Sequence, residues 1–264
     1  MSSPQLPLSG RVALITGVSR FNGIGFAVAR RLGQMGASLF LHGWPQFDEQ
    51  MEYVGPDEPL GFPVVDALRR EGLAVEYIEH DFMDPEGPER VVVAAVEAYG
   101  HVDIVDANHA YGVEDRLETL DYTELDKHLL VNIRGTLMLV KAFAAQHDGR
   151  PGGRVIMMTS GQHMGSGGAN ELSYMTSKAS LHWLTGPLSA ELIERGITVN
   201  TINPGPVDTG YATGDRWQQV VDGMPLGRWG QPDDVANVIG WLCTDAAQWI
   251  TGQVINSEGG FRRS

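Results

Sequence analysis

The chain has 264 residues, with 19 Lys and Arg against 33 Asp and Glu, which gives a formal net charge of -14. One α/β domain of this length can bury a full core, and an acidic chain without long basic runs is excluded as a general nucleic-acid binder. The acidity also argues against anionic membranes, and the lone Cys243 excludes an internal disulfide. We see no Cys/His spacing typical of a metal site, no signal peptide and no apolar run of about 20 residues, so we expect a metal-free cytoplasmic protein.

Short apolar runs alternate with helical stretches along the chain. We predict strands at 11–16, 38–42, 74–78, 102–106, 153–159, 197–202 and 253–256. Helices are predicted near 23–35, 63–71, 86–98, 122–147, 174–195 and 232–243, the fourth opened by an Asp121 cap. This alternation predicts one α/β domain over 1–264, with a core at 10–261. Its sheet should be seven-stranded, doubly wound and mostly parallel, with helices on both faces.

A glycine-rich turn joins the first predicted strand to the first helix. It reads Thr16-Gly17-Val18-Ser19-Arg20-Phe21-Asn22-Gly23-Ile24-Gly25. Glycines let a backbone approach a pyrophosphate, and the helix N-terminus offers free N–H groups. An ordinary turn is the alternative, but its place after the first strand favours nucleotide binding. The residues predicted to contact the cofactor here are Gly17, Ser19, Arg20, Asn22, Gly23, Ile24 and Gly25.

A long irregular segment, 43–62, follows the second predicted strand. It is rich in Gly, Pro, Asp and Glu and lies where the adenosine half of a cofactor would bind. Long loops in compact domains are often functional. A solvated acidic loop is an equally open interpretation of this insertion.

Tyr174 and Lys178 lie four residues apart, on one face of a predicted helix. A buried ammonium beside a tyrosine favours the phenolate and lowers the tyrosine pKa from about 10. The pair would then exchange protons near neutral pH. Such spacing also arises by chance on surface helices, but the chain contains only three lysines, Lys127, Lys141 and Lys178.

Several ordered motifs over roughly 10–261 together resemble the short-chain dehydrogenase/reductase family, in its 3-oxoacyl-acyl-carrier-protein reductase-like branch. The glycine turn is similar to the family's Thr-Gly-x3-Gly-x-Gly pattern with two extra residues. The family's active-site residues match Asn132, Ser160, Tyr174 and Lys178, with a Ser-to-Tyr spacing one residue longer than usual. Asn203–Thr209 is similar to its Pro-Gly-x3-Thr segment, and Ile250–Ile255 with Glu258-Gly259-Gly260 to its C-terminal strand.

The resemblance implies a Rossmann fold and a set of roles. Tyr174 would be the general acid in carbonyl reduction or the base in alcohol oxidation, and Ser160 would hold the substrate oxygen. Lys178 would bind the nicotinamide ribose and lower the Tyr174 pKa, and Asn132 would hold a relay water. Further cofactor contacts would come from His42, Asp81, Phe82, Asn108, Tyr174, Lys178, Pro204, Gly205, Val207 and Thr209. Asp81 is equally consistent with a helix-capping role.

The resemblance also locates the substrate side. Residues 210–228 correspond to the segment that covers the substrate in the family, so we expect a lid there. The substrate candidates are Ser160, Gln162, His109, Tyr211 and Trp217. His109 lies in Ala107-Asn108-His109-Ala110, where the family has Asn-Asn-Ala-Gly. It either lines the substrate mouth or is a tolerated change in a supporting loop.

Charge at the end of the second strand indicates the cofactor. NAD-selective relatives carry an acid there, whereas this chain has Leu41-His42-Gly43. Arg20 could pair with a 2′-phosphate and His42 could assist, although the acidic 43–62 segment argues against this. We therefore favour NADP(H) over NAD(H).

The function that we predict is reversible hydride transfer between NADP(H) and a free small-molecule carbonyl or secondary alcohol. Alternatives are an NAD-dependent alcohol or sugar dehydrogenase of the same family, or a catalytically silent nucleotide-binding protein. Relatives commonly form tetramers through helices equivalent to 122–147 and 174–195 and the C-terminal strand, so we expect a homotetramer, with a dimer as the alternative.

Overall fold

The computed structural model describes residues 5–164 and 170–261. Within these residues, seven strands form one fully parallel sheet in the order β3-β2-β1-β4-β5-β6-β7. They are β1 (Val12–Thr16), β2 (Ser38–Gly43), β3 (Val75–Glu79), β4 (Ile104–Ala107), β5 (Gly153–Met158), β6 (Ile197–Asn203) and β7 (Val254–Asn256). The predicted α/β class, the parallel sheet and the strand positions are confirmed.

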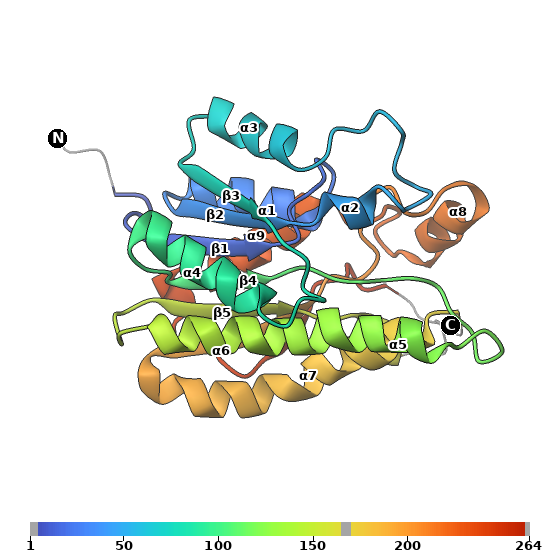
Figure 1. Ribbon diagram of the computed structural model, residues 1–264. Coiled ribbons are helices and arrows are strands. Elements are labelled where there is room, and N and C mark those ends of the chain that lie inside the picture. The colour runs from blue at the N-terminus through green and yellow to red at the C-terminus, as the bar shows by residue number, and fades with distance from the viewer. Residues whose placement is uncertain (1–4, 165–169, 262–264) are drawn as a thin grey trace.

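Helices cover both faces of the sheet (Figure 1). One layer contains α1 (Ile24–Gln34), α3 (Phe62–Arg70) and α9 (Pro232–Leu242), and the other contains α4 (Gly87–Tyr99), α6 (Thr136–Gln146) and α7 (Leu172–Leu192). A large apolar cluster fills the space between the sheet and each layer. Because both faces are covered, β1, β4, β5 and β6 are buried along their whole length.

The strand order reverses at β1, which pairs with β2 on one side and with β4 on the other. Successive connections leave β1 and β4 in opposite directions, and open α/β sheets bind their ligands at the carboxyl ends of such strands. The glycine turn and the loops after β4, β5 and β6 all follow strands, so they meet at this edge. The fold therefore brings the predicted motifs to one side of the molecule.

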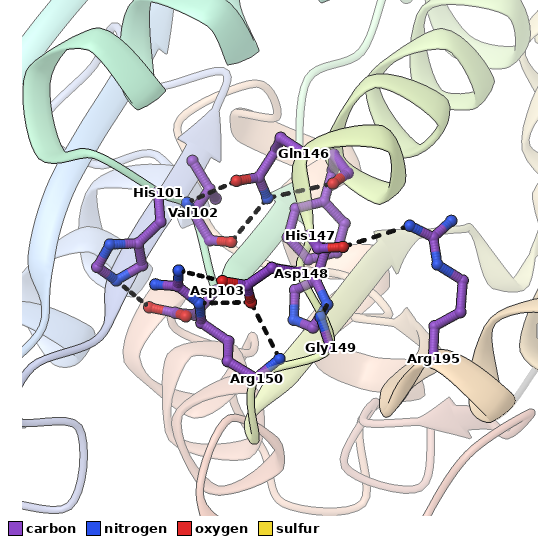
Figure 2. Close-up of polar contacts among 10 residues, drawn as sticks. His101, Val102, Asp103, Gln146, His147, Asp148, Gly149, Arg150 and Arg195 are labelled. Atoms are coloured by element: carbon purple, nitrogen blue, oxygen red, sulfur yellow. Dashed lines mark hydrogen bonds and ion pairs between the residues drawn. The ribbon is translucent and has the colours of Figure 1, made fainter.

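At the amino ends of the strands, polar contacts surround the start of β4 (Figure 2). Gln146, at the end of α6, donates to Val102 O at 2.8 Å and accepts from Val102 N at 3.2 Å. The carboxylate of Asp103 lies 3.0 Å from His101 Nε2 and accepts a hydrogen bond from Val12 N at 2.8 Å. These contacts anchor β4 far from the edge that carries the motifs.

The helix predicted over 122–147 is interrupted. It consists of α5 (Tyr122–His128), a π-helical turn η1 (Leu129–Gly135) and α6. The Asp121 carboxylate caps α5 as predicted, by accepting from Thr123 N and Glu124 N. A π turn widens the backbone spiral locally and is frequent at functional sites. Tyr122–Gln146 is apolar and long enough to cross a membrane, but half of its apolar stretch is buried inside the fold, as in the core helix of a globular domain.

Both irregular segments contain short helices. The insertion includes α2 (Pro45–Asp48), and the predicted lid includes α8 (Gly214–Gly223). Single turns of 3₁₀-helix follow β5, α7 and α9, as η2 (Gly161–Met164), η3 (Ile193–Arg195) and η4 (Asp245–Ala247). Figure 1 shows α2 and α8 on the same side of the molecule as the carboxyl ends of the strands.

Candidate active site

The glycine turn is drawn tightly against the loop after β4. Gly17 has a φ of +72°, and a Cβ at this position would lie 2.8 Å from the Cα of His109. A Cβ on Gly25 would lie 2.6 Å from Gly17 O. Asn108 Nδ2 donates to Thr16 O at 3.0 Å and to Gly17 O at 3.1 Å. Positions 17 and 25 therefore require glycine, and Asn108 holds the turn in place through its two hydrogen bonds.

The N-terminus of α1 suits a phosphate group. The helix begins after Gly23 with no side-chain cap and no acidic residue in its first turn. The first backbone N–H groups of a helix lack intrahelical acceptors, and the helix dipole favours an anion there. This end of α1, next to the glycine turn, fits the pyrophosphate of a dinucleotide.

The insertion folds back onto the glycine turn instead of extending into solvent. Ser19 O accepts from Gly61 N at 2.9 Å, and Ser19 Oγ accepts from Trp44 N at 3.3 Å. Arg20 is buried, with its Nε 3.0 Å from Glu58 Oε1 and its guanidinium 5.0 Å from the centre of the Tyr53 ring. The guanidinium that we expected to meet a 2′-phosphate is therefore paired with an acid of the chain itself.

His42 cannot offer charge to a phosphate in this structure. Its ring is buried, stacks on Phe82 at 4.3 Å and places Nε2 2.8 Å from His80 O. Burial lowers the pKa of His42 to about 4, so the ring is neutral at neutral pH. The expected assistance from His42 to Arg20 is thus not supported. Asp81 accepts a hydrogen bond from Met83 N at 2.8 Å, which closes a local turn, and it does not cap α4, whose N-cap residue is Glu86.

His109 lies under the sheet edge, not at the substrate mouth. Its side chain is buried, with Nδ1 2.7 Å from Thr16 Oγ1 and Nε2 3.4 Å from Thr136 Oγ1. Its ring also meets Phe82 edge-on at 4.6 Å. The prediction that His109 lines the mouth is contradicted, because both ring nitrogens face the interior. The structure favours the supporting role.

Helix α7 carries the predicted proton-transfer pair. Lys178 is 2% exposed, and its Nζ donates to Met158 O at 2.9 Å while lying 5.9 Å from the centre of the Tyr174 ring. Met158 ends β5, and Ser160 follows two residues later at the same edge. The fold therefore brings Tyr174 and Lys178 to the strand end that carries Ser160.

Burial dominates the electrostatics of this pair. It lowers the pKa of Lys178 to about 8, and the charge of Asp106 opposes that shift. Burial also raises the pKa of Tyr174, and the negative charge of Glu171 adds to the increase. Burial therefore outweighs the lowering expected from Lys178, so the net pKa of Tyr174 is raised and its hydroxyl keeps its proton through the neutral range.

Asn132 lies in η1 and is completely buried. Its Oδ1 accepts from Tyr111 N at 2.7 Å, and its Nδ2 donates to Tyr111 O at 2.9 Å and to Ser177 Oγ at 2.8 Å. The amide thus ties the loop after β4 to helix α7, between Tyr174 and Lys178. Its position in the π turn aims the side chain across the helix interface.

The loop after β6 joins the glycine turn to the lid. Gly205 has a φ of +64°, where a Cβ would collide with Glu258. Val207 is buried, and Thr209 O accepts from Asn22 Nδ2 at 3.0 Å. Pro204, Gly205, Val207 and Thr209 therefore border the site from the β6 side, opposite the glycine turn.

Polar contacts connect the lid to α7. Arg216 of α8 lies 2.8 Å from Glu114 and 3.6 Å from Glu171, and Gln162 donates to the Glu171 carboxylate. Trp217 is partly exposed, and its Nε1 donates to Asp208 at 3.2 Å. Tyr211 packs edge-on against Trp229 at 5.6 Å. Gln162 thus contacts Glu171 directly, and the negative charge of Glu171 helps to raise the pKa values of Tyr211 and Tyr174.

Two residues near Tyr174 were missed by the sequence interpretation. Glu171 precedes Tyr174 by three residues, so helical spacing alone could have identified it. Tyr53 belongs to the insertion, and no local pattern indicates that this loop reaches toward α7. Its influence on Tyr174 follows only from the way the insertion folds over the glycine turn.

Proteins of similar sequence identify the family of this chain. Residues 17–262 match the family model described as Enoyl-(Acyl carrier protein) reductase. The chain is 35% identical over 255 residues to the uncharacterized oxidoreductase YjdA of Bacillus subtilis, covering 96% of this chain and 97% of that protein. It is 32% identical to a cyclohexanol dehydrogenase of a Rhodococcus species, covering 98% of each.

Among solved structures, a blue fluorescent protein from a metagenomic library, in complex with NADPH, superimposes with a TM-score of 0.85. It is 28% identical, and the match covers 97% of this chain and 99% of the other. The family model, the relatives and the ordered motifs at one sheet edge lead to one conclusion. The chain belongs to the short-chain dehydrogenase/reductase family.

Proposed function

We propose that this oxidoreductase uses NADP(H) to interconvert a small-molecule carbonyl and a secondary alcohol, with Tyr174 as the proton donor and acceptor. The supporting observation is the placement of Tyr174 and Lys178 by α7 beside the end of β5, where Ser160 follows. The glycine turn and the open N-terminus of α1 lie at the same edge.

A bound nicotinamide cofactor would supply or accept the hydride. In the reductive direction, Tyr174 donates its hydroxyl proton to the substrate oxygen, and Ser160 holds that oxygen in place. The buried Lys178 ammonium contributes a positive charge that stabilises the phenolate left on Tyr174. Asn132 keeps the loop after β4 and α7 in register through Tyr111 and Ser177.

The protonation state of Tyr174 favours reduction at neutral pH. Because burial raises the pKa of Tyr174, the hydroxyl is ready to donate a proton but must first lose it to act as a base. We therefore expect carbonyl reduction to be fast near neutral pH and alcohol oxidation to need alkaline conditions. Initial rates in both directions across the pH range would test this difference.

NADP(H) is supported by the end of β2 and by a relative. His42 and Gly43 stand where NAD-selective proteins carry an acid, and the metagenomic relative binds NADPH. Arg20 would receive the 2′-phosphate by exchanging Glu58 for it. The specific observation in favour of NAD(H) is this same pair, because Glu58 neutralises the one guanidinium that we assign to the phosphate.

Binding titrations with NADPH and NADH decide the cofactor. Wild-type protein should bind NADPH more tightly, and Arg20→Ala should remove most of the difference without changing NADH affinity. Arg30→Ala, which removes an exposed guanidinium from α1, is the matched control. Tighter binding of NADH by the wild type would reverse the assignment.

The reaction itself can be followed through the absorbance of NADPH with a panel of ketones and aldehydes. Cyclohexanone is a reasonable first substrate, since one relative is a cyclohexanol dehydrogenase. Turnover of at least one neutral carbonyl is the expected result. A protein that binds NADPH but reduces nothing in a broad panel would instead support a catalytically silent nucleotide-binding function.

A further inference from the structure

Asp106 is a buried acid that the active-site geometry leaves unexplained. It lies on β4 and pairs with Ile15 on β1 and Ile156 on β5. Its side chain has no exposed surface, and neither carboxylate oxygen has a hydrogen-bond partner among the residues that the structure describes. Buried carboxylates are ordinarily paired or bonded, so a reason for this one is needed.

The surroundings of Asp106 are apolar. Residues directly opposite each other in adjacent strands project to the same face, so the Asp106 side chain emerges between those of Ile15 and Ile156. Both isoleucines belong to the apolar cluster beneath α1 and α9. A valine or leucine would fit this environment better, which means that packing does not account for the acid.

Lys178 is the buried opposite charge near this position. Its Nζ is bonded to Met158 O on β5, and Met157 pairs with Ala107, the residue after Asp106. Lys178 approaches from α7, and its Nζ therefore ends at a carbonyl two residues along β5 from Ile156, the strand partner of Asp106. Lys178 opposes the burial effect that raises the pKa of Asp106 to about 7, and Asp106 does the same for Lys178. Both groups are buried, so solvent screens their interaction weakly.

Other titratable groups around the pair are neutral at neutral pH. His109 faces Lys178 from the loop after β4, and burial holds its pKa well below the usual value. Cys243, just after α9, faces Asp106, and burial raises the pKa of its thiol to about 12. Tyr174 lies beside Lys178 and keeps its proton. Asp106 is thus the acid that acts on Lys178 from within the fold.

We propose that Asp106 is an electrostatic positioning residue for the reaction. Its carboxylate, unbonded and held under the sheet edge, keeps the buried Lys178 side chain in the ammonium form. The inference rests on the proposed function, because the ammonium matters for catalysis only if Tyr174 and Lys178 form the proton-transfer pair. Asp106 touches neither substrate nor cofactor and acts through Lys178.

The state of Lys178 can be measured without any substrate. With only three lysines in the chain, ¹³C-lysine labelling gives three Cε resonances, and Lys178→Arg identifies the one of interest. A nearby opposite charge shifts the pKa of a buried group by about one unit or more. Asp106→Asn should therefore lower the Lys178 titration midpoint by about one pH unit.

Asp103→Asn is the matched control. Asp103 is also buried on the approach to β4, but its carboxylate is bonded to Val12 N and paired with His101 at the far edge (Figure 2). Its substitution should leave the Lys178 midpoint unchanged. If Asp106→Asn folds poorly, Asp106→Val offers a second uncharged side chain suited to the apolar surroundings. An unchanged Lys178 midpoint in a folded Asp106 variant would overturn the proposal.

Activity then separates this inference from the proposed function. On a confirmed substrate, Asp106→Asn should move the alkaline limit of kcat/KM to lower pH by about the shift seen in the spectra. A shifted midpoint with an unmoved pH profile would refute the positioning role. A shifted midpoint in a protein that reduces no carbonyl would leave the electrostatic effect intact and refute the proposed function instead.

Discussion

Burial, more than the nearest charge, decides how the titratable residues of this site behave. Tyr174 lies beside Lys178, yet its pKa is raised because desolvation outweighs the ammonium. The spacing of the two residues predicts their proximity correctly. It does not reveal how deeply the surrounding loops bury them, and that depth determines the direction of the pKa shift.

His42 gives a prediction about acid stability. Its folded-state pKa of about 4 lies below the unfolded value of about 6.5, so the unfolded chain binds the proton more readily. Stability from the neutral ring is complete above about pH 6.5 and falls by about 3 kcal/mol as the pH approaches 4. His42→Gln should flatten this slope.

Urea unfolding of the wild type and of His42→Gln at several pH values checks the His42 effect. A comparison at pH about 8, where the ring is neutral in both states, separates the packing change from the titration. Parallel pH slopes for the two proteins would show that His42 does not contribute.

The site residues could be identified from the sequence where they occur in ordered motifs. Asn132, Ser160, Tyr174 and Lys178 were identified from their order and surroundings, and the fold brings their elements to one edge. His109 and His42 were misjudged because a sequence does not show which way a ring at a strand end points. Both rings turn inward against Phe82, with His42 stacked on it and His109 edge-on.

At the scale of elements, the strands and the main helices follow directly from apolar periodicity. The fold of the insertion could not be predicted in this way, because the composition of residues 43–62 indicates only a polar loop. In the structure it folds onto the glycine turn through Ser19 and Arg20. These contacts join residues at least 25 positions apart, and no local pattern encodes such a pairing.

The insertion should regulate cofactor affinity through Glu58. Its carboxylate holds Arg20 in a partly buried ion pair, with 9% and 24% of the two side chains exposed. Partly buried pairs of this kind contribute about 1 kcal/mol, so Glu58→Gln should tighten NADPH binding about fivefold. Fluorescence titration with NADPH and NADH measures the effect.

Asp57→Asn is the control for Glu58, because it removes a neighbouring exposed charge and leaves the Arg20 pair intact. Equal gains for both cofactors, or for both variants, would mean that the general acidity of the loop matters and the Arg20 pair does not.

The 210–228 segment should act as a substrate lid. Trp217 offers a partly exposed ring near Trp229, and Arg216 connects α8 to Glu114 and Glu171 near the site. Trp217→Ala should raise the apparent KM of the substrate and leave NADP(H) affinity nearly unchanged. Leu226→Ala is the control: it changes an exposed apolar residue after α8 and should leave the KM of the substrate nearly unchanged.

Hydrogen exchange distinguishes a lid from a fixed wall. Amides of 210–228 should become more protected when cofactor and substrate are both present. Equal protection with and without ligands, or a loss of assembly in Trp217→Ala, would instead assign Trp217 a structural role.

For the whole molecule, the surface of α7 points to self-association. Trp183 is 80% exposed on the helix that carries Tyr174, and Ile193 just beyond the helix end is also exposed. A large apolar side chain in this position is typical of a shared helix interface. We therefore propose a homotetramer, with contacts along α7 and the neighbouring α5–α6 segment.

Light scattering at micromolar concentration tests the assembly. The wild type should scatter as a multiple of the 28.7 kDa chain, and Trp183→Glu should reduce that mass. Leu117→Glu changes a similarly exposed residue in the loop before α5, and this variant should keep the mass of the wild type. A wild-type mass of 28.7 kDa would refute the tetramer.

Single-turnover reduction by NADPH in Tyr174→Phe tests most directly whether Tyr174 delivers the proton. With the first carbonyl that the wild type reduces, the variant should keep its fold and NADPH affinity but react about 10²-fold more slowly or worse, as expected when a positioned acid is lost. Tyr122→Phe, which changes an exposed tyrosine at the start of α5, should react like the wild type. A Tyr174→Phe protein with a near-wild-type rate would contradict the proposed mechanism.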